Sequence, residues 1–169
     1  MHRRPRGSKT RKERLNCNPS THLFSACAIS LINDININLI YRNIACFAGK
    51  QFFIIGSKTW HKGATNGLEE LMPIRYFKSF SEFKEYNKAV LNHTLIAVEQ
   101  SNNSVLINKI RKYPKNPCFI FGNEAVGLGD DVLLNSSMTV EIPMDGYHPC
   151  VNVGCASAIV FYDFVRKNG

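Results

Sequence analysis

Short apolar segments alternate along the chain with longer segments in which apolar residues recur at helical spacing. The apolar segments predict strands at residues 24–31, 51–55, 74–77, 94–98, 118–121 and 139–142. Each segment is almost continuously apolar, which is typical of strands buried on both faces of a parallel sheet. Helices are predicted at residues 36–48, 81–92, 105–113 and 152–167, with Ser81 as the N-cap of the second. This alternation predicts an α/β fold in which helical crossovers join parallel strands.

The length and composition indicate a single globular domain. The chain has 169 residues, of which 44% are hydrophobic and 20% are charged. Its longest apolar runs are strand-length, whereas a membrane-spanning helix needs about 20 apolar residues, so a membrane protein is excluded. No apolar segment follows the N-terminal arginines, and we therefore expect a cytoplasmic protein, with an organelle address in the N-terminal segment left open.

The net charge of +8 is concentrated at the N-terminus. Residues 1–14 hold seven basic side chains and one acidic side chain, whereas the remaining residues hold 14 basic and 12 acidic groups. We predict a basic tail over residues 1–20 and a folded domain over residues 21–169. Cationic tails bind nucleic-acid phosphates through counterion release, although a solvated leader without a ligand explains the charge equally well. The candidate RNA contacts in the tail are Arg3, Arg4, Arg6, Lys9, Arg11 and Lys12.

The six cysteines form no CxxC pair, which weighs against a zinc site. Cys150 and Cys155 lie near His148 in the sequence, but no second pair of ligands accompanies them. We predict free thiols of a reducing compartment and no metal ion.

Three polar loops follow predicted strands, and ligands of open α/β sheets bind at the carboxyl ends of strands. The first loop, residues 33–38, leads into a helix in which Arg42 lies among apolar residues. A side chain such as Asn36 can simply cap that helix. The charge of Arg42, however, needs a carboxylate, a phosphate or a partner chain.

The second and third loops are rich in residues that shape the backbone. Residues 121–129 contain glycines typical of a tight turn or of close approach to a ligand, but they match neither a P-loop nor the dinucleotide fingerprint. Residues 142–153 contain two prolines, which make the segment rigid. Near its end, Asn152 is placed to cap the last helix.

Taken together, the three loops closely resemble the SpoU (TrmH-like) family of the SPOUT RNA methyltransferases, over about residues 24–166. The first motif is the segment Asn36-Ile37-Asn38-Leu39-Ile40-Tyr41-Arg42. The second is Phe121-Gly122-Asn123-Glu124, followed by Gly127-Leu128. The third is Ile142-Pro143-Met144 with Gly146 and Cys150-Val151-Asn152-Val153, followed by Ala156, Ala158, Ile159 and Tyr162.

The resemblance implies a SPOUT-type parallel-sheet domain with a deep C-terminal trefoil knot that binds S-adenosylmethionine, and an obligate homodimer. It further implies an enzyme that methylates a ribose 2′-hydroxyl of structured RNA, with transfer RNA as the first expectation and ribosomal RNA as the second. The cofactor-binding positions implied by the resemblance are Phe121, Gly122, Asn123, Gly127, Ile142, Met144, Gly146, Cys150, Val151 and Asn152.

The implied catalytic positions are Arg42, Glu124, Cys150 and Asn152, and Asn36 and Arg42 are also expected to contact RNA. Because the pKa of arginine exceeds about 12, Arg42 is expected to clamp a phosphate and stabilise a developing alkoxide and not to act as an ordinary base. Glu124 and Asn152 would fix the loops that face the substrate. Alternatively, Glu124 caps backbone amides.

Two positions depart from the family pattern. Asn38 stands where the family has glycine, and asparagine is expected there because it tolerates unusual backbone angles. Cys150 stands where the family usually has serine. Three readings stay open for Cys150: an inert substitute for serine, a nucleophile that attacks a pyrimidine base for base methylation, or a change that impairs catalysis and leaves an RNA-binding dimer.

Overall fold

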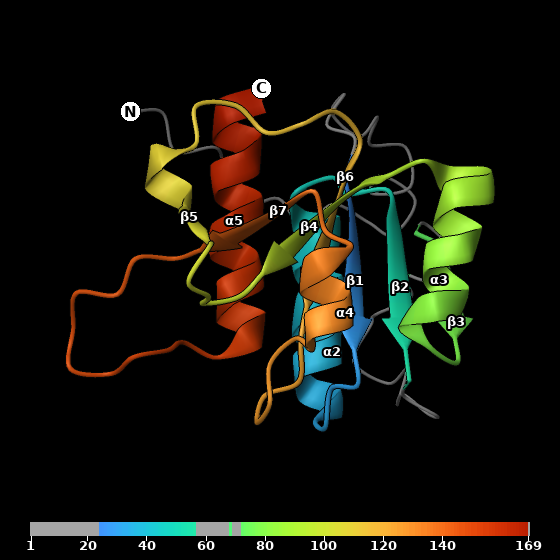
Figure 1. Ribbon diagram of the computed structural model, residues 1–169, viewed down its shortest axis with the longest axis horizontal. Helices are drawn as coiled ribbons and strands as arrows, with labels where there is room; N and C mark the ends of the chain where they lie inside the picture. Colours follow the sequence, from blue (N-terminus) through green and yellow to red (C-terminus); the bar gives the residue numbers. More distant parts are fainter. Residues whose placement is uncertain (1–23, 57–67, 69–71, 169) are drawn as a thin grey trace, which may run out of the picture.

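The computed structural model describes residues 24–56, 68 and 72–168 (Figure 1). The described part of the chain forms a seven-stranded sheet in the order β3-β2-β1-β6-β4-β7-β5, in which each neighbouring pair is parallel. The strands are β1 (Ser25–Ile29), β2 (Gln51–Ile55), β3 (Ile74–Phe77), β4 (Thr94–Val98), β5 (Val105–Leu106), β6 (Pro117–Phe121) and β7 (Met138–Glu141). This sheet confirms the predicted α/β fold, whereas the knot stays a prediction, and the basic tail lies outside the described residues.

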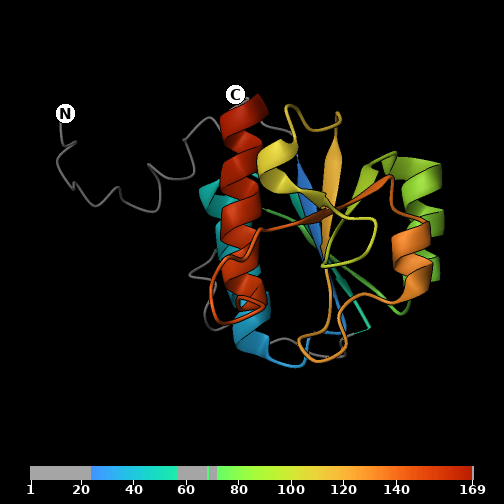
Figure 2. The same ribbon diagram turned by 60° about the vertical axis from the view of Figure 1, so that its left-hand side comes forward.

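Helices cover both faces of the sheet (Figures 1 and 2). The helices α2 (Asp34–Cys46) and α5 (Val153–Asn168) lie side by side on one face, together with the 3₁₀ turn η4 (Ile107–Lys109). The other face carries α3 (Phe80–Tyr86), which continues as the π-helical turn η3 (Asn87–Leu91), and the short helix α4 (Asp130–Leu134). None of the described helices is long and apolar enough to cross a membrane.

Two apolar clusters, one on each face, explain why the central strands are almost continuously apolar. On the α2/α5 face, the ring of Phe24 lies 4.8 Å from that of Phe161 between ring centroids. On the other face, Phe53 lies 5.0 Å from Phe83 by the same measure. Alternate residues of β1, β2, β4 and β6 therefore enter different clusters, so that both sets must be apolar.

Two of the predicted helices, α2 and α3, begin slightly earlier than the sequence predicts. The N-cap of α2 is Asn33 and not Asn36, because the Asn33 side chain accepts a hydrogen bond from the amide of Ile35 at 2.9 Å. The N-cap of α3 is Ser79 and not Ser81, and its hydroxyl accepts from the amide of Glu82 at 3.3 Å.

The prediction of a helix at residues 105–113 is wrong. The segment instead forms β5, the turn η4 and extended chain that packs against α5. Tyr113 anchors it, since its hydroxyl donates to a carboxylate oxygen of Asp163 at 2.8 Å and its amide donates to the side chain of Asn168 at 3.3 Å. These tertiary contacts use the same apolar residues that gave the segment its helical spacing.

Candidate active site

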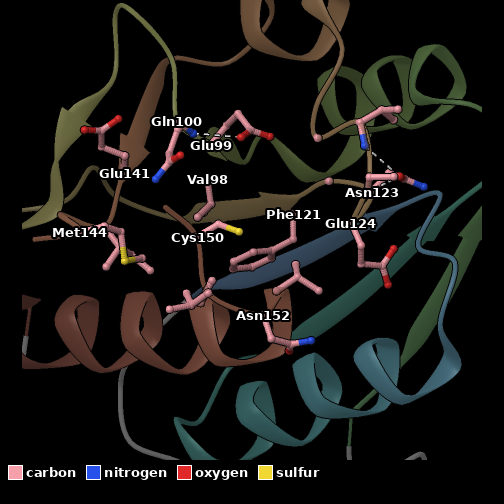
Figure 3. A pocket seen from close by; sticks show the side chains of 18 of the residues that line it. Val98, Glu99, Gln100, Phe121, Asn123, Glu124, Glu141, Met144, Cys150 and Asn152 are labelled. Atoms are coloured by element: carbon pink, nitrogen blue, oxygen red, sulfur yellow. Dashed lines mark hydrogen bonds between the residues drawn. The ribbon is translucent and has the colours of Figure 1, made fainter. Parts of the chain in front are cut away.

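A cavity of about 500 Å³ lies at the carboxyl ends of β4, β6 and β7 (Figure 3). Its wall is formed by the end of β4, by the loop after β6 and by the segment that leads from β7 into α5. This is the edge of the sheet at which parallel α/β proteins bind ligands, and the volume lies within the range of about 300–1,000 Å³ that small-molecule sites occupy.

The cavity collects most of the site residues expected from the sequence. The expected cofactor positions that line it are Phe121, Gly122, Asn123, Gly127, Ile142, Met144, Cys150, Val151 and Asn152. Glu124 also lines it, so three of the four expected catalytic residues meet there. Gly146 does not line the cavity, and a Cβ atom added to it would meet nothing within 4 Å. Its place in the structure therefore gives no spatial reason for a glycine.

The loop after β6 closes on itself as a tight turn. The amide of Gly127 donates to the carbonyl of Asn123 at 2.9 Å, and the amide of Asn123 donates back at 3.2 Å. Gly127 has a φ of +68°, and a Cβ atom on Gly122 would lie 2.5 Å from the carbonyl carbon of Gly127. Backbone geometry alone thus requires both glycines, and the turn holds the neighbouring Glu124 at the cavity.

A chain of side-chain hydrogen bonds joins the three sequence motifs. The side-chain amide of Asn152 donates to Oδ1 of Asn36 at 2.9 Å, and the amide of Asn36 donates to Oε1 of Glu124 at 2.7 Å. Asn152 also caps α5 as expected, since its Oδ1 accepts from the amide of Gly154 at 2.8 Å. The loops after β1, β6 and β7 are therefore fixed to one another beside the cavity.

Glu124 does cap backbone amides, as the alternative reading expected. Its carboxylate accepts from the amides of Ile32 at 2.9 Å and Asn33 at 3.3 Å, which lie in the loop between β1 and α2. Partial burial tends to raise the pKa of Glu124, but the hydrogen bonds from Ile32, Asn36 and Asn33 outweigh it and hold this pKa below its ordinary value. An ionised Glu124 is a weak proton acceptor at neutral pH, so its geometry suits positioning better than general-base catalysis.

Arg42 is exposed and does not line the cavity. It lies six residues after Asn36 on α2, which places its side chain about 120° around the helix from the Asn36 side chain. None of the ion pairs among the described residues includes Arg42. Of the partners expected for its charge, a phosphate and a second chain therefore have support from its position.

Asn38 does not adopt the unusual backbone angle that was expected of it. It lies within α2, is buried, and is absent from the described residues with positive φ. Its side-chain amide donates to the carbonyl of Asp34 at 2.9 Å, one helical turn earlier. Asparagine is thus accommodated at this position by a local hydrogen bond and not by its tolerance of the left-handed region.

Cys150 is exposed and lines the cavity, with its Sγ 3.8 Å from Nδ1 of His148. The same His148 nitrogen lies 2.8 Å from the Cys150 carbonyl oxygen, so the segment folds back on itself. Cys27 and Cys118, by contrast, are buried in the sheet, and burial raises the pKa of both thiols. Within the described ranges, no group of three or more His, Cys, Asp or Glu side chains is placed to hold a metal ion.

The sequence analysis missed the residues that the end of β4 contributes. Val98, Glu99 and Gln100 line the cavity beside the two expected loops, and Glu141 lines it from the end of β7. The signal that could have found them is their position at the carboxyl end of a predicted strand or directly after it, because ligands of open α/β sheets bind at this edge.

The fold and the cavity define a parallel α/β protein with a ligand site at the carboxyl edge of its sheet. The chain belongs to the SpoU rRNA Methylase family, whose sequence model matches residues 28–162. Over 73 residues, it is 30% identical to a tRNA (guanosine(18)-2′-O)-methyltransferase of Escherichia coli, a match that covers 43% of this chain and 31% of the relative. The chain covers less than a third of the length of the curated relatives that it matches.

Solved structures share the fold. A TrmH/SpoU tRNA modifying enzyme of A. aeolicus superposes with a TM-score of 0.74 at 21% identity, covering 86% of this chain and 75% of the other. The SpoU methyltransferase AviRb of Streptomyces viridochromogenes, in complex with the cofactor AdoMet, gives a TM-score of 0.76 at 18% identity and covers 85% of this chain and 57% of the other.

Proposed function

We propose that the protein is an S-adenosylmethionine-dependent RNA methyltransferase that modifies a ribose 2′-hydroxyl of structured RNA, with transfer RNA as the first substrate to test and ribosomal RNA as the second. The observation that carries the proposal is the hydrogen-bonded meeting of Asn36, Glu124 and Asn152 at one cavity, in a chain of the SpoU family. The E. coli relative is a tRNA (guanosine(18)-2′-O)-methyltransferase, which supports the choice of transfer RNA.

The cavity suits the proposed methyl donor. Val98, Phe121 and Ile142 provide apolar wall for an adenine ring, and the lining contains carboxylates but, among the described residues, no lysine or arginine. Carboxylates favour a ligand that carries positive charge, as a sulfonium does. When bound, S-adenosylmethionine supplies an electrophilic methyl group. Phe121, Gly122, Ile142 and Val151, which line the cavity, would hold it. The AdoMet complex of AviRb supports the choice of this cofactor.

The remaining chemical task falls to the chain itself, which must orient a poorly acidic hydroxyl and stabilise the charge left when its proton departs. Glu124, Asn36 and Asn152 hold the loops that face the substrate. Arg42 contacts the adjacent phosphate, which takes the departing proton, and stabilises the alkoxide as it develops. Because its guanidinium keeps its charge throughout, it acts as an electrostatic clamp.

The exposed position of Arg42 supports a homodimer as part of the proposal. On α2, Arg42 belongs to the same outward stripe as Ile35, which is 64% exposed. The neighbouring helix α5 presents Ile159 and Tyr162 outward, with 38% and 59% exposure. A second copy that covers these apolar side chains would carry its own arginine toward the cavity of the first.

The C-terminal knot also belongs to the proposal and follows from the family resemblance. It would involve the segment of residues 143–151, which lines the cavity with Met144, His148, Cys150 and Val151 before the chain enters α5.

The test of this function is transfer of a labelled methyl group to total transfer RNA by the full chain, followed by alkaline hydrolysis. A methylated 2′-hydroxyl cannot attack the adjacent phosphate, so we expect label in alkali-resistant dinucleotides. Arg42→Ala should lower turnover by about 100-fold or more, because it removes an electrostatic contact to the developing charge. Arg111→Ala, which changes another exposed arginine outside the cavity, is the matched control.

Label that appears only in mononucleotides would contradict ribose transfer and favour base methylation through Cys150. RNA binding without any transfer or donor binding would favour the catalytically impaired dimer. Equal turnover of Arg42→Ala and Arg111→Ala would contradict the role given to Arg42.

A further inference from the structure

Residues 99 and 100 occupy a central position in the site. Strand β4 lies between β6 and β7 in the sheet, and these two neighbours lead into the two loops that wall the cavity. The residues directly after β4 are Glu99 and Gln100, and both line the cavity between those loops (Figure 3). The backbone of Glu99 is fixed to the sheet, since its amide donates to the carbonyl of Val140 at 3.0 Å.

Glu99 holds the loop after β6. One carboxylate oxygen accepts from the amide of Leu128 at 2.9 Å, and the other accepts from the amide of Gln100 at 3.0 Å. The carboxylate also lies directly against Gly127, because a Cβ atom at that position would collide with Oε2 of Glu99. Gly127 thus serves two purposes: its φ of +68° shapes the turn, and its missing side chain lets the Glu99 carboxylate approach the turn closely.

Gln100 holds the other loop. Its side-chain amide donates to the carbonyl of Pro149 at 2.7 Å, across 49 positions of the sequence. Residues 145–151 are exposed throughout. Among the described residues, the contact with Gln100 is the one hydrogen bond that joins segment 143–151 to another part of the chain. The position of this wall of the cavity therefore depends on a single side chain.

We propose that Glu99 and Gln100 are positioning residues that set the distance between the two loops and so prepare the cavity for the methyl donor. This inference rests on the proposed function, since it assigns the ligand of the same cavity. A loop that is already held in place loses less conformational freedom when a ligand binds, and the affinity for that ligand is correspondingly higher. The two residues contribute through the loops that they hold.

The test measures the dissociation constant of S-adenosylmethionine by calorimetry on the full chain, with the melting temperature of each ligand-free variant as a second readout. Gln100→Ala should weaken binding about three- to tenfold, the effect of one lost hydrogen bond, at an unchanged melting temperature. Gln100→Glu keeps the shape but places a carboxylate against the Pro149 carbonyl, and we expect at least as large a loss. Glu99→Gln should also weaken binding, because its side chain has a single accepting oxygen and cannot accept from the amides of both Leu128 and Gln100.

Asn103→Ala is the matched control, since Asn103 is exposed in the same connection and does not line the cavity. The dissociation constant of S-adenosylmethionine from Asn103→Ala should equal that from the wild type. Equal affinity in the wild type, Gln100→Ala and Glu99→Gln would overturn the inference while leaving the proposed function intact. Failure of the wild type itself to bind the donor would instead contradict the proposed function and remove the ligand on which the inference depends.

Discussion

At the scale of single residues, the site combines positions that sequence patterns reveal with contacts that they do not. Glu124 and Asn152 were predictable because they follow strands within a recognisable motif, and both line the cavity. Gln100 was not predictable, because the residue that its side chain contacts, Pro149, lies 49 positions away and no local pattern marks the pair. The reason given for Asn38 was wrong, because a helical residue needs no left-handed backbone.

Cys150 gives the prediction that belongs to this scale. We expect Cys150→Ser to keep methyl transfer within about threefold of the wild type or to raise it, because a hydroxyl is a stronger hydrogen-bond donor and acceptor than a thiol of similar size. The rate of transfer to transfer RNA measures this. Cys155→Ser, which changes an exposed thiol of α5 outside the cavity, is the control. Complete loss of transfer in Cys150→Ser alone would point to a covalent role for the thiol.

At the scale of elements, the strands were predictable and the short connections were not. Burial on both faces makes each long strand a continuous apolar run, so the six predicted strands lie within about two residues of those observed. The helix α4 has only five residues and β5 only two, which is too short for a periodic signal. Residues 105–113 have apolar residues at helical spacing, yet these side chains pack against α5 from extended chain. The spacing alone does not distinguish such a segment from the apolar face of a helix.

The amino ends of the central strands carry a titratable contact. His93 lies just before β4, and its Nε2 is 2.7 Å from the hydroxyl oxygen of Ser25 on β1. Burial, assisted by the charge of Lys50, lowers the pKa of His93 from 6.5 to about 4. A lowered pKa in the folded state means that the unfolded chain binds the proton first as the pH falls.

We therefore expect the free energy of unfolding to be independent of His93 above pH 6.5 and to decrease as the pH falls toward about 4. The decrease should be about 1 kcal/mol, because the ring is partly exposed and solvent weakens the effect. Urea unfolding at a series of pH values measures it. His93→Gln should reduce the slope in this window relative to the wild type. An unchanged slope in His93→Gln would contradict the role given to this ring.

At the scale of the whole molecule, Arg42 is exposed and does not line the cavity of its own chain. The family resemblance predicted both the arginine and the dimer. The structure adds that Arg42 shares its stripe of α2 with the exposed Ile35 and that the neighbouring helix α5 exposes Ile159 and Tyr162. The proposed dimer therefore has a functional consequence, since the subunits would complete each other's sites.

We expect Ile159→Glu to convert a dimer into a monomer, because it places a charge in the proposed apolar interface. The dissociation constant of the dimer should rise by about 100-fold, the equivalent of roughly 3 kcal/mol, as measured by sedimentation equilibrium. The monomer should still bind S-adenosylmethionine but lose methyl transfer. Val90→Glu changes an exposed apolar residue of η3, on the opposite face of the sheet, and is the control. A wild type that is monomeric at micromolar concentration would contradict the dimer.

The strand order has a further consequence for biosynthesis. β6 lies between β1 and β4, so a growing chain that has not yet released residues 117–121 from the ribosome cannot join its first three strands to β4. Until then, β1 and β4 each expose an unpaired edge, and such edges are the places where nascent chains associate wrongly. The same strand that joins β1 to β4 also leads directly into the Glu124 loop, so a chain made only as far as β4 has neither a continuous sheet nor a cavity.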